Sequence, residues 1–342
     1  MADSIRTRFT DRFSIRYPIA QAGMAFAGWS PPLAIAVARA GGIGAIGAGL
    51  LPPDVVRGMV QALKAANAGP FHINFLTPFD HDVPARICAD ERVPAVSFHW
   101  GHPKPALIKL LKDAGCTVWE QVGNVEDARR AIGDGVDVIV AQGNEAGGHN
   151  YQGMPTFALV PAMRDAIGDT LMLAAGGVSD GRGVAAALML GADGVWVGTR
   201  LVATAEAAVH DEHKRRLVGA AGSDTTLSSI FGPENPAFNP MRVITNRVVR
   251  EWNHRLSEVP ATAQALAAQP EIGSTVLGGQ TMTLRKFNVL LPTPETKGDW
   301  EEMPFLAGQG VGLIKDVAPA QQVVERMMSE ARAVLAGAGR MV

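Results

Sequence analysis

The sequence has few cysteines and no excess charge of either sign. Cys88 and Cys116 are the only cysteines among 342 residues, and no CxxC pair occurs. Two thiols are too few to crosslink a chain of this length, so we expect a protein of the reducing cytoplasm. The formal net charge is -2, and no stretch interleaves Lys or Arg with aromatic residues. These features exclude a nucleic-acid groove.

Long apolar runs are also missing. The first 21 residues carry basic side chains but no apolar core with a small-residue cleavage site, which argues against a signal peptide. The most apolar region, residues 33–53, is interrupted by Arg39 and by several glycines. Because a membrane span needs about 20 consecutive apolar residues, we expect no membrane association and interpret this region as a helix followed by a strand.

Several catalytic signatures are absent as well. No GxSxG motif occurs, and the two cysteines lie in helix-like or turn contexts that indicate inert thiols. His210 and His213 have helical spacing within a charged run, which favours a solvated helix face over a metal site. His99 and His102 have the same spacing but no evident carboxylate partner in the sequence. We therefore expect no bound metal and no nucleophilic triad.

What the chain does contain is an alternation of short apolar runs with amphipathic stretches. Helix-like segments with Ser, Asn, Asp or Pro start signals separate the runs. Eight strands are predicted, at 17–24, 42–49, 71–76, 95–100, 117–122, 136–143, 170–178 and 194–202. Nearly continuous apolar strands are typical of a parallel sheet that is buried on both faces, and eight of them predict a (β/α)8 TIM barrel. An open doubly wound sheet is disfavoured because the turn after the first strand lacks GxGxxG spacing.

The character of the sequence changes after residue 222. Residues 222–300 are more polar and rich in proline, and we predict that they form a small inserted cap that shapes the substrate pocket. Residues 1–221 and 301–342 are assigned to the barrel. Within the cap, 248–271 is expected to be a helix and 280–288 to be loosely ordered, whereas 317–339 has the apolar spacing of a last helix that packs on the barrel.

Glycines follow the last two predicted strands. The loops at 174–183 and 197–200 contain Gly176, Gly177, Gly198 and Thr199. In a barrel these two loops lie where phosphate groups commonly bind, because glycine lets backbone N–H groups approach closely and a helix N-terminus adds a favourable dipole. The alternative is that the glycines only form tight turns. Their occurrence in both loops predicts a phosphorylated ligand.

A histidine follows the sixth strand, in the stretch AQGNEAGGH at 141–149. Taken alone, a loop histidine is more often a surface residue than a catalyst. Gly147 and Gly148 permit close approach of a flat ligand, however, and His149 faces the same barrel mouth as the phosphate loops. An imidazole in this place can transfer a proton at neutral pH. We interpret Glu145 as a loop anchor and not as a second base.

Several motifs occur together in one order. They are PIAQAGM at 18–24, SFHWGHP at 97–103, QGNEAGGH at 142–149, the block at 174–201, and AGQGVGLI at 307–314. With these motifs the sequence resembles the nitronate monooxygenase family, formerly called 2-nitropropane dioxygenases. The resemblance implies an FMN enzyme on a barrel with a small cap, and it is least specific over residues 222–300.

The resemblance also implies roles for individual residues. His149 matches the active-site histidine, which acts as a base toward nitroalkanes or as a polar anchor for the nitronate. The implied FMN contacts are Gly23 and Met24 at the isoalloxazine, Asn74 and Gln121 beside the flavin, Gln142 and Gly148 near the ring and ribityl chain, and Gly176, Gly177, Gly198 and Thr199 around the phosphate.

The implied reaction is oxidation of an alkyl nitronate, or a nitroalkane, by O2 to a carbonyl compound and nitrite. The EAGGH block is shared by FMN-dependent enoyl-ACP reductases, and flavin-dependent quinone reductases are further relatives. An FMN enzyme that uses NAD(P)H to reduce an enoyl thioester or quinone is therefore the alternative. A phosphate-binding barrel without redox activity is a third possibility. As partners we expect a small-molecule substrate and O2, with the chain as a monomer or homodimer.

Overall fold

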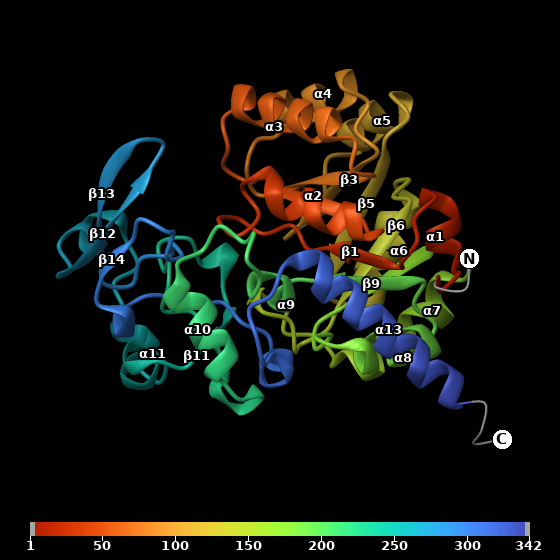
Figure 1. Cartoon of the computed structure of the whole chain (residues 1–342). Helices are drawn as coiled ribbons and strands as arrows, with labels where there is room; N and C mark the ends of the chain where they lie inside the picture. The colour runs from red at the N-terminus through yellow and green to blue at the C-terminus, as the bar shows by residue number, and fades with distance from the viewer. Residues whose placement is uncertain (1–3, 339–342) are drawn as a thin grey trace.

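The structure is a computed structural model that describes residues 4–338. Eight parallel strands form its central sheet, in the order β1-β9-β8-β6-β5-β4-β3-β2 (Figure 1). They are β1 (Ile19–Gln21), β2 (Gly44–Gly47), β3 (Phe71–Leu76), β4 (Ala95–His99), β5 (Thr117–Val122), β6 (Val138–Gln142), β8 (Leu171–Ala175) and β9 (Gly194–Val197). Backbone hydrogen bonds between Ile43 and residues 19 and 21 join β1 to β2. The predicted TIM barrel is therefore confirmed.

Helices surround the sheet, where the sequence predicts helix-like segments between the strands. The outer helices are α2 (Pro31–Ala40), α3 (Pro53–Ala66), α4 (Asp82–Asp90), α5 (Pro105–Asp113), α6 (Val125–Gly133), α7 (Thr156–Ile167) and α8 (Gly181–Met189). A short α1 (Arg8–Phe13) precedes the barrel, and α9 (Thr199–Val202) follows β9. Because α9 is too short to cover the sheet, the last helix α13 (Ala320–Ala338) packs against α8 and α2, which confirms the prediction for the tail (Figure 1).

Strand alternation divides the core into an inner and an outer layer. In β5, Trp119 points into the barrel and packs near Phe9 and Trp196, whereas Val118 belongs to the layer between strands and helices. Cys88 and Cys116 lie in that outer layer as buried free thiols. Burial raises the pKa of the Cys116 thiol to about 11, and that of Cys88 is also raised. Both thiols are therefore protonated at neutral pH.

Two small sheets accompany the barrel. Strands β10 (Thr225–Ser228) and β11 (Met241–Ile244) form a hairpin, and β11 also pairs with β7 (Gly148–His149). The second sheet contains β12 (Glu271–Leu277), β13 (Gln280–Arg285) and β14 (Lys297–Gly298), and it lies to one side of the barrel (Figure 1). The stretch predicted as loosely ordered is thus wrong in part, because 280–285 is a strand paired to β12 through the turn at Gly278 and Gly279.

The single helix predicted for 248–271 is also wrong. The segment forms α11 (Arg247–Trp252), a turn of 3-10 helix at 256–258, and α12 (Ala263–Ala267). Pro260 lies between the last two and cannot continue a helix, and Thr262 begins α12 by accepting a hydrogen bond from Ala265 N–H. The division of the chain into a barrel (1–221 with 301–342) and a cap (222–300) stays a prediction.

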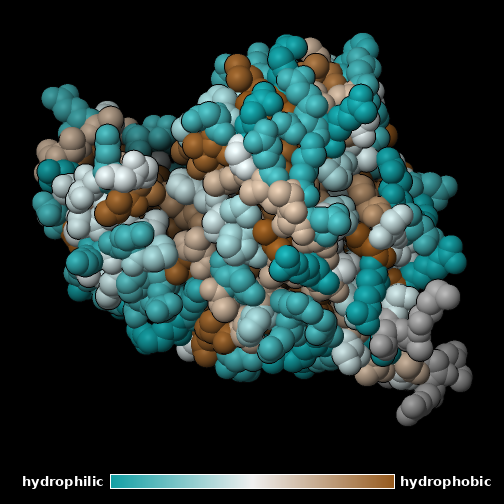
Figure 2. All heavy atoms as spheres, turned by 45° about the horizontal axis from the view of Figure 1, so that its top comes forward, coloured by the Kyte–Doolittle hydropathy of each residue, from teal (hydrophilic) through white to brown (hydrophobic). Residues whose placement is uncertain are grey.

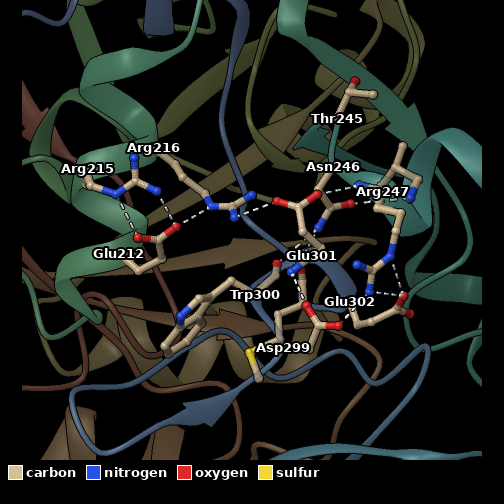
Figure 3. Close-up of polar contacts among 12 residues, drawn as sticks. Glu212, Arg215, Arg216, Thr245, Asn246, Arg247, Asp299, Trp300, Glu301 and Glu302 are labelled. Carbon is tan, nitrogen blue, oxygen red and sulfur yellow. Dashed lines mark hydrogen bonds and ion pairs between the residues drawn. The ribbon is translucent and has the colours of Figure 1, made fainter.

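An ion-pair network joins α10 (Asp211–Gly219), α11 and residues 299–303 (Figure 3). Arg216 contacts Glu212 and Glu301 at 2.7 Å each, and its guanidinium lies over the Phe305 ring at 4.5 Å. Arg247 contacts Glu302 at 2.9 Å, and its backbone N–H donates to Glu301. The network fixes the segment that returns from β14 to the barrel.

We expect Arg216→Ala to lower the free energy of unfolding by about 2 kcal/mol, because Glu212 and Glu301 each lose one of their partners and Phe305 loses a cation contact. Arg250 is the matched control, since it is 61% exposed and lies 3.7 Å from Glu301. Arg250→Ala should change stability by less than about 0.5 kcal/mol. Chemical denaturation measures both values, and equal losses would contradict the assignment.

His102, which the sequence left without a carboxylate partner, has two. Its Nδ1 lies 2.8 Å from Glu120 and its Nε2 lies 2.8 Å from Asp134. The sequence could not show this contact because Glu120 is on a neighbouring strand and points outward from the barrel. Burial raises the pKa of Glu120 to about 7, and the neighbouring His102 opposes the shift. No group of three or more His, Cys, Asp or Glu residues within 4–338 is arranged to hold a metal ion.

This carboxyl makes stability depend on pH. Its ordinary pKa is 4.5 and its pKa in the folded protein is about 7, so the unfolded chain releases the proton first as pH rises. Stability must then fall between these two values, by up to about 3 kcal/mol. We expect Glu120→Gln to flatten the profile of melting temperature between pH 4.5 and 7. The exposed Glu126→Gln variant should keep the original slope, and parallel profiles for all three proteins would contradict the prediction.

Candidate active site

A cavity of about 400 Å³ opens at the carboxyl end of the barrel strands. It is lined by barrel loops, by residues 306–310 and by residues of the segment 231–291. On the face shown in Figure 2, hydrophobic residues lie in small groups among hydrophilic ones and form no broad apolar surface. The cavity is therefore the main candidate for a small-molecule site.

The structure brings all of the predicted site residues to this one cavity. The lining includes Gly23, Met24, Asn74, Gln121, Gln142, Gly148, His149, Gly176, Gly177, Gly198 and Thr199. They come from the ends of six different barrel strands or from the loops that follow them, as a barrel mouth requires. Their individual contacts with a cofactor stay predictions.

A buried chain of hydrogen bonds forms the floor beneath Asn74. His72 Nε2 lies 2.8 Å from the Gln21 carbonyl, so it carries the proton, and its Nδ1 accepts from Ser97 Oγ at 2.9 Å. Ser97 Oγ in turn accepts from Asn74 Nδ2 at 2.9 Å. Burial lowers the pKa of His72 to about 4, which keeps the ring neutral. This series of hydrogen bonds fixes the Asn74 amide through its Nδ2, and the amide oxygen takes no part in it.

Gly23 is required beside this amide. A Cβ at position 23 would lie 2.1 Å from Asn74 Cγ and 2.4 Å from its Oδ1. Real Cβ atoms do not approach so closely, so a larger residue would displace Asn74 or the loop. The predicted pairing of Gly23 and Asn74 at one flat ligand is consistent with this packing.

Three glycine-rich loops meet at the far side of the cavity. Loop 143–149 packs on loop 307–312, since a Cβ at Gly308 would lie 2.6 Å from the Glu145 carbonyl. A Cβ at Gly310 would lie 2.8 Å from the carbonyl of Gly177, on the third loop. Thr199 Oγ1 accepts from Gly308 N–H at 3.0 Å, which joins the start of α9 to the loop 307–312. At Gly308 and Gly310 the backbones of these loops therefore approach one another closely.

The residues predicted to bind phosphate are Gly176, Gly177, Gly198 and Thr199, here called the phosphate cradle. Their backbone N–H groups decide whether a phosphate fits. No acceptor within residues 4–338 receives the backbone N–H of Gly176, Gly177, Gly198 or Thr199. Gly177 is exposed and the other three residues are partly exposed where they line the cavity, so a ligand can supply the acceptor, and phosphate oxygens are suitable acceptors. The residues present therefore fit the phosphate group of a ligand.

Carboxylates already accept from N–H groups at the N-terminus of α8, whereas the predicted contribution of helix N-termini to phosphate binding stays a prediction. Asp180 Oδ1 accepts from Gly183 N–H at 3.1 Å, and Glu330 Oε2 of α13 accepts from Gly181 N–H at 2.7 Å. Two carboxylates thus already occupy this helix end, and they would repel an anion. The free donors lie in the turn before the helix and not at its first residues.

The loop that carries His149 is held rigidly. Glu145 accepts from the backbone N–H and the hydroxyl of Thr156 at 2.9 Å, at the start of α7, which supports its interpretation as a loop anchor. Arg242 of β11 donates to both oxygens of Asn144. Gln142 donates from Nε2 to the His149 carbonyl at 2.9 Å. The amide of Gln142 therefore serves the loop as well as lining the cavity.

Aromatic rings surround the His149 imidazole. The Trp100 ring centroid lies 5.5 Å from it, and Trp100 stacks on Tyr151 at 4.8 Å. The Tyr151 hydroxyl donates to the Gln121 carbonyl and accepts from Trp100 N–H, both at 2.9 Å. Burial raises the pKa of this hydroxyl well above its usual range. A second histidine, His99, lies 6.3 Å away between ring centroids.

The remaining wall of the cavity is apolar. Its lining includes Phe231, Met241, Val289, Leu291 and Leu306, and no Asp, Glu, Lys or Arg occurs among the described lining residues. The histidine predicted on a solvated helix face, His213, is buried against this wall and donates to the Leu306 carbonyl. Burial lowers its pKa to about 4. The prediction failed because α10 packs on the 305–306 segment.

Sequence reasoning missed one part of the cavity entirely. Gly308 and Gly310 line it, although the motif AGQGVGLI contributed only to the resemblance. The glycine spacing at 308, 310 and 312 was the available signal, since close backbone approach requires glycine. The apolar wall from residues 231–291 carried no comparable signal.

A TIM barrel with a cavity at the carboxyl end of its strands, whose described lining carries imidazoles and no charged side chain, is the architecture of an enzyme that acts on small molecules. The family model described as "Nitronate monooxygenase" matches residues 6–87 and 81–330. The chain belongs to the nitronate monooxygenase family and is a flavin-dependent oxidoreductase.

Named relatives and solved structures are similar over nearly the whole chain. A "Probable nitronate monooxygenase" of Bacillus subtilis is 31% identical, covering 94% of this chain and 98% of the relative. A "(3aS,4S,5R,7aS)-5-hydroxy-7a-methyl-1-oxo-octahydro-1H-indene-4-carboxyl-CoA dehydrogenase" of Rhodococcus jostii is 29% identical, covering 96% of each. The FabK structure from Thermotoga maritima has a TM-score of 0.80 and 31% identity, covering 99% of this chain and 100% of that one. A nitroalkane oxidase structure from Streptomyces ansochromogenes has a TM-score of 0.76 and 28% identity, covering 96% and 99%.

The helices were also compared with the length and hydropathy that a membrane span requires. Among residues 4–338, no helix is both long and apolar enough to cross a bilayer. The cytoplasmic location, the oligomeric state and the use of O2 stay predictions.

Proposed function

We propose that this protein is an FMN-dependent nitronate monooxygenase, which oxidises alkyl nitronates with O2 to carbonyl compounds and nitrite. The observation that carries the proposal is that one cavity combines glycine N–H groups that have no acceptor among residues 4–338 with two imidazoles and an apolar wall. The cradle suits the phosphate, the imidazoles suit the nitro oxygens, and the wall suits an alkyl chain.

When bound, FMN supplies the electron acceptor for the substrate and the electron donor for O2. Gly176, Gly177, Gly198 and Thr199 would hold its phosphate, and Gly23, Met24, Asn74, Gln121, Gln142 and Gly148 would lie along the ring and ribityl chain. His149 would accept the α-proton of a neutral nitroalkane at its imidazole nitrogen, or orient a preformed nitronate. Trp100 packs against this imidazole, and Tyr151 stacks on Trp100.

A second candidate is an FMN-dependent NAD(P)H reductase for an enoyl thioester or a quinone. Similarity to the Rhodococcus jostii protein, which is named as a dehydrogenase of a coenzyme A thioester, favours it. The absence of basic side chains from the described cavity lining disfavours a carrier whose phosphates enter the cavity.

Anaerobic reduction separates the two candidates. Protein purified with its yellow cofactor is mixed in a stopped-flow instrument with propyl nitronate or with NADH or NADPH, and the flavin absorbance is followed. Bleaching by the nitronate and not by the nicotinamides supports the monooxygenase, and the opposite pattern would sink it. Chromatography of the released cofactor identifies FMN, and a colourless protein that binds no added FMN would favour a barrel without redox activity.

A further inference from the structure

We propose that His99 is a second side chain that contacts the substrate, and that its Nδ1–H donates a hydrogen bond to one oxygen of a planar oxyanion. This inference rests on the proposed function, because it takes the cavity as the place where the substrate lies over the cofactor. It adds a residue and a substrate property to that function: a flat anionic head with two oxygens, attached to an apolar tail.

The position of His99 follows from strand alternation. Ala95 and Ser97 of β4 point into the barrel, so His99 at the end of the strand points to its mouth. Gln121 lies opposite on β5, and its Nε2 is 3.0 Å from Nε2 of His99. With the Gln121 amide donating, His99 Nε2 is an acceptor and the ring proton lies on Nδ1. Gln121 acts here as a positioning residue that selects the tautomer.

The remaining ring nitrogen faces the cavity. His99 lines the cavity, and its Nδ1 has no partner among residues 4–338. Since this atom is not among the fully buried polar atoms without a partner, it is accessible from the cavity. The ring is fixed by Trp100 at 5.6 Å and Tyr151 at 5.9 Å between centroids. An accessible donor on a fixed ring is a preorganised hydrogen-bonding group.

The lack of charged side chains in the described lining makes a neutral donor such as His99 Nδ1–H important for binding an anion. No charged side chain occurs in the described lining, so an anionic head must be held by neutral donors and by His149. Burial, and then the charge of nearby His149, lower the pKa of His99 to about 3. His99 is therefore neutral at physiological pH and keeps one donor, while His149 remains available for proton transfer. The two rings lie nearly perpendicular, with an interplanar angle of 72°.

Butanoate tests this arrangement without turnover, because its carboxylate is a planar oxyanion on a short alkyl chain and it cannot be oxidised in the proposed reaction. Its dissociation constant is measured by calorimetry on flavin-loaded protein. We expect His99→Phe, which keeps an aromatic ring but no donor, to weaken butanoate binding at least tenfold. His99→Asn places an amide N–H near the position of Nδ1 and should bind within about threefold of the unsubstituted protein. The flavin content of both variants should be unchanged.

Three outcomes overturn the proposal. They are an unchanged dissociation constant in His99→Phe, equal weakening in His99→Asn and His99→Phe, and no butanoate binding by the unsubstituted protein. The stopped-flow comparison tests the proposed function, and its outcome is independent of the butanoate measurement. Butanoate binding that depends on His99, in a protein that propyl nitronate does not bleach, would retain the oxyanion site and remove the monooxygenase function.

Discussion

His149→Ala is expected to lower kcat/KM for a neutral nitroalkane by about 100-fold or more, while the protein keeps its flavin. General-base catalysis by a positioned side chain contributes roughly 10² to 10⁴-fold, and the loop backbone that lines the cavity does not depend on the imidazole. Turnover of a preformed nitronate should fall much less, because its α-proton has already been removed. Steady-state assays of nitrite release with both substrate forms measure the difference.

His254 provides the matched control. Its side chain is exposed and lies outside the cavity lining, so His254→Ala should leave both rates unchanged. Equal losses on nitroalkane and nitronate in His149→Ala would contradict a base and would assign His149 to positioning of the oxyanion. No loss on either substrate would remove His149 from the reaction.

Gly308→Ala is expected to abolish flavin retention and to destabilise the barrel mouth. The backbone of Gly308 has φ -81° and ψ 167°, which alanine adopts without strain. The effect comes from space alone, because the added Cβ would lie 2.6 Å from the Glu145 carbonyl and 2.9 Å from Gly147 N. Separating these loops costs about 1 to 3 kcal/mol and moves the donors of the phosphate cradle. Flavin absorbance per polypeptide and the melting temperature measure both effects.

Gly58→Ala is the control for this substitution. Gly58 lies within α3, and a Cβ there meets no atom within 4 Å. Alanine should therefore stabilise the protein by about 0.5 to 1 kcal/mol through helix propensity, with full flavin content. If Gly308→Ala also retained its flavin and its melting temperature, the close packing of the three loops would not be needed for the cofactor.

The barrel was predictable because its strands leave a local pattern. Residues 138–142 and 171–175 are nearly continuous apolar runs, as burial on both faces of a parallel sheet demands. The turn after β8 was predictable for a similar reason, since Gly176 and Gly177 have φ of 103° and 76° and mark the turn directly, whereas its phosphate-binding role stays a prediction. Strand ends and glycines are thus local signals, although the cavity that they line is built from segments far apart in the sequence.

Contacts between distant segments left no such signal. The carboxylate partners of His102 come from a neighbouring strand and the end of α6, and the carboxylate over the α8 N-terminus comes from Glu330 on the last helix. Burial of His213 likewise depends on where residues 305 and 306 return. Each of these features requires the tertiary fold, which helical spacing or charge runs do not reveal.

The pairing of β7 with β11 limits how this protein could be redesigned. His149 faces Met241 in that pairing, and Arg242 of the same strand binds Asn144 in the histidine loop. Residues 222–300 therefore cannot be exchanged with another protein's as a detachable specificity module. A chimera that replaces the strand at 241–244 would change the backbone support of the imidazole together with the substrate wall, so engineering for new substrates should begin with side chains such as Phe231 and Leu291 and keep β11 intact.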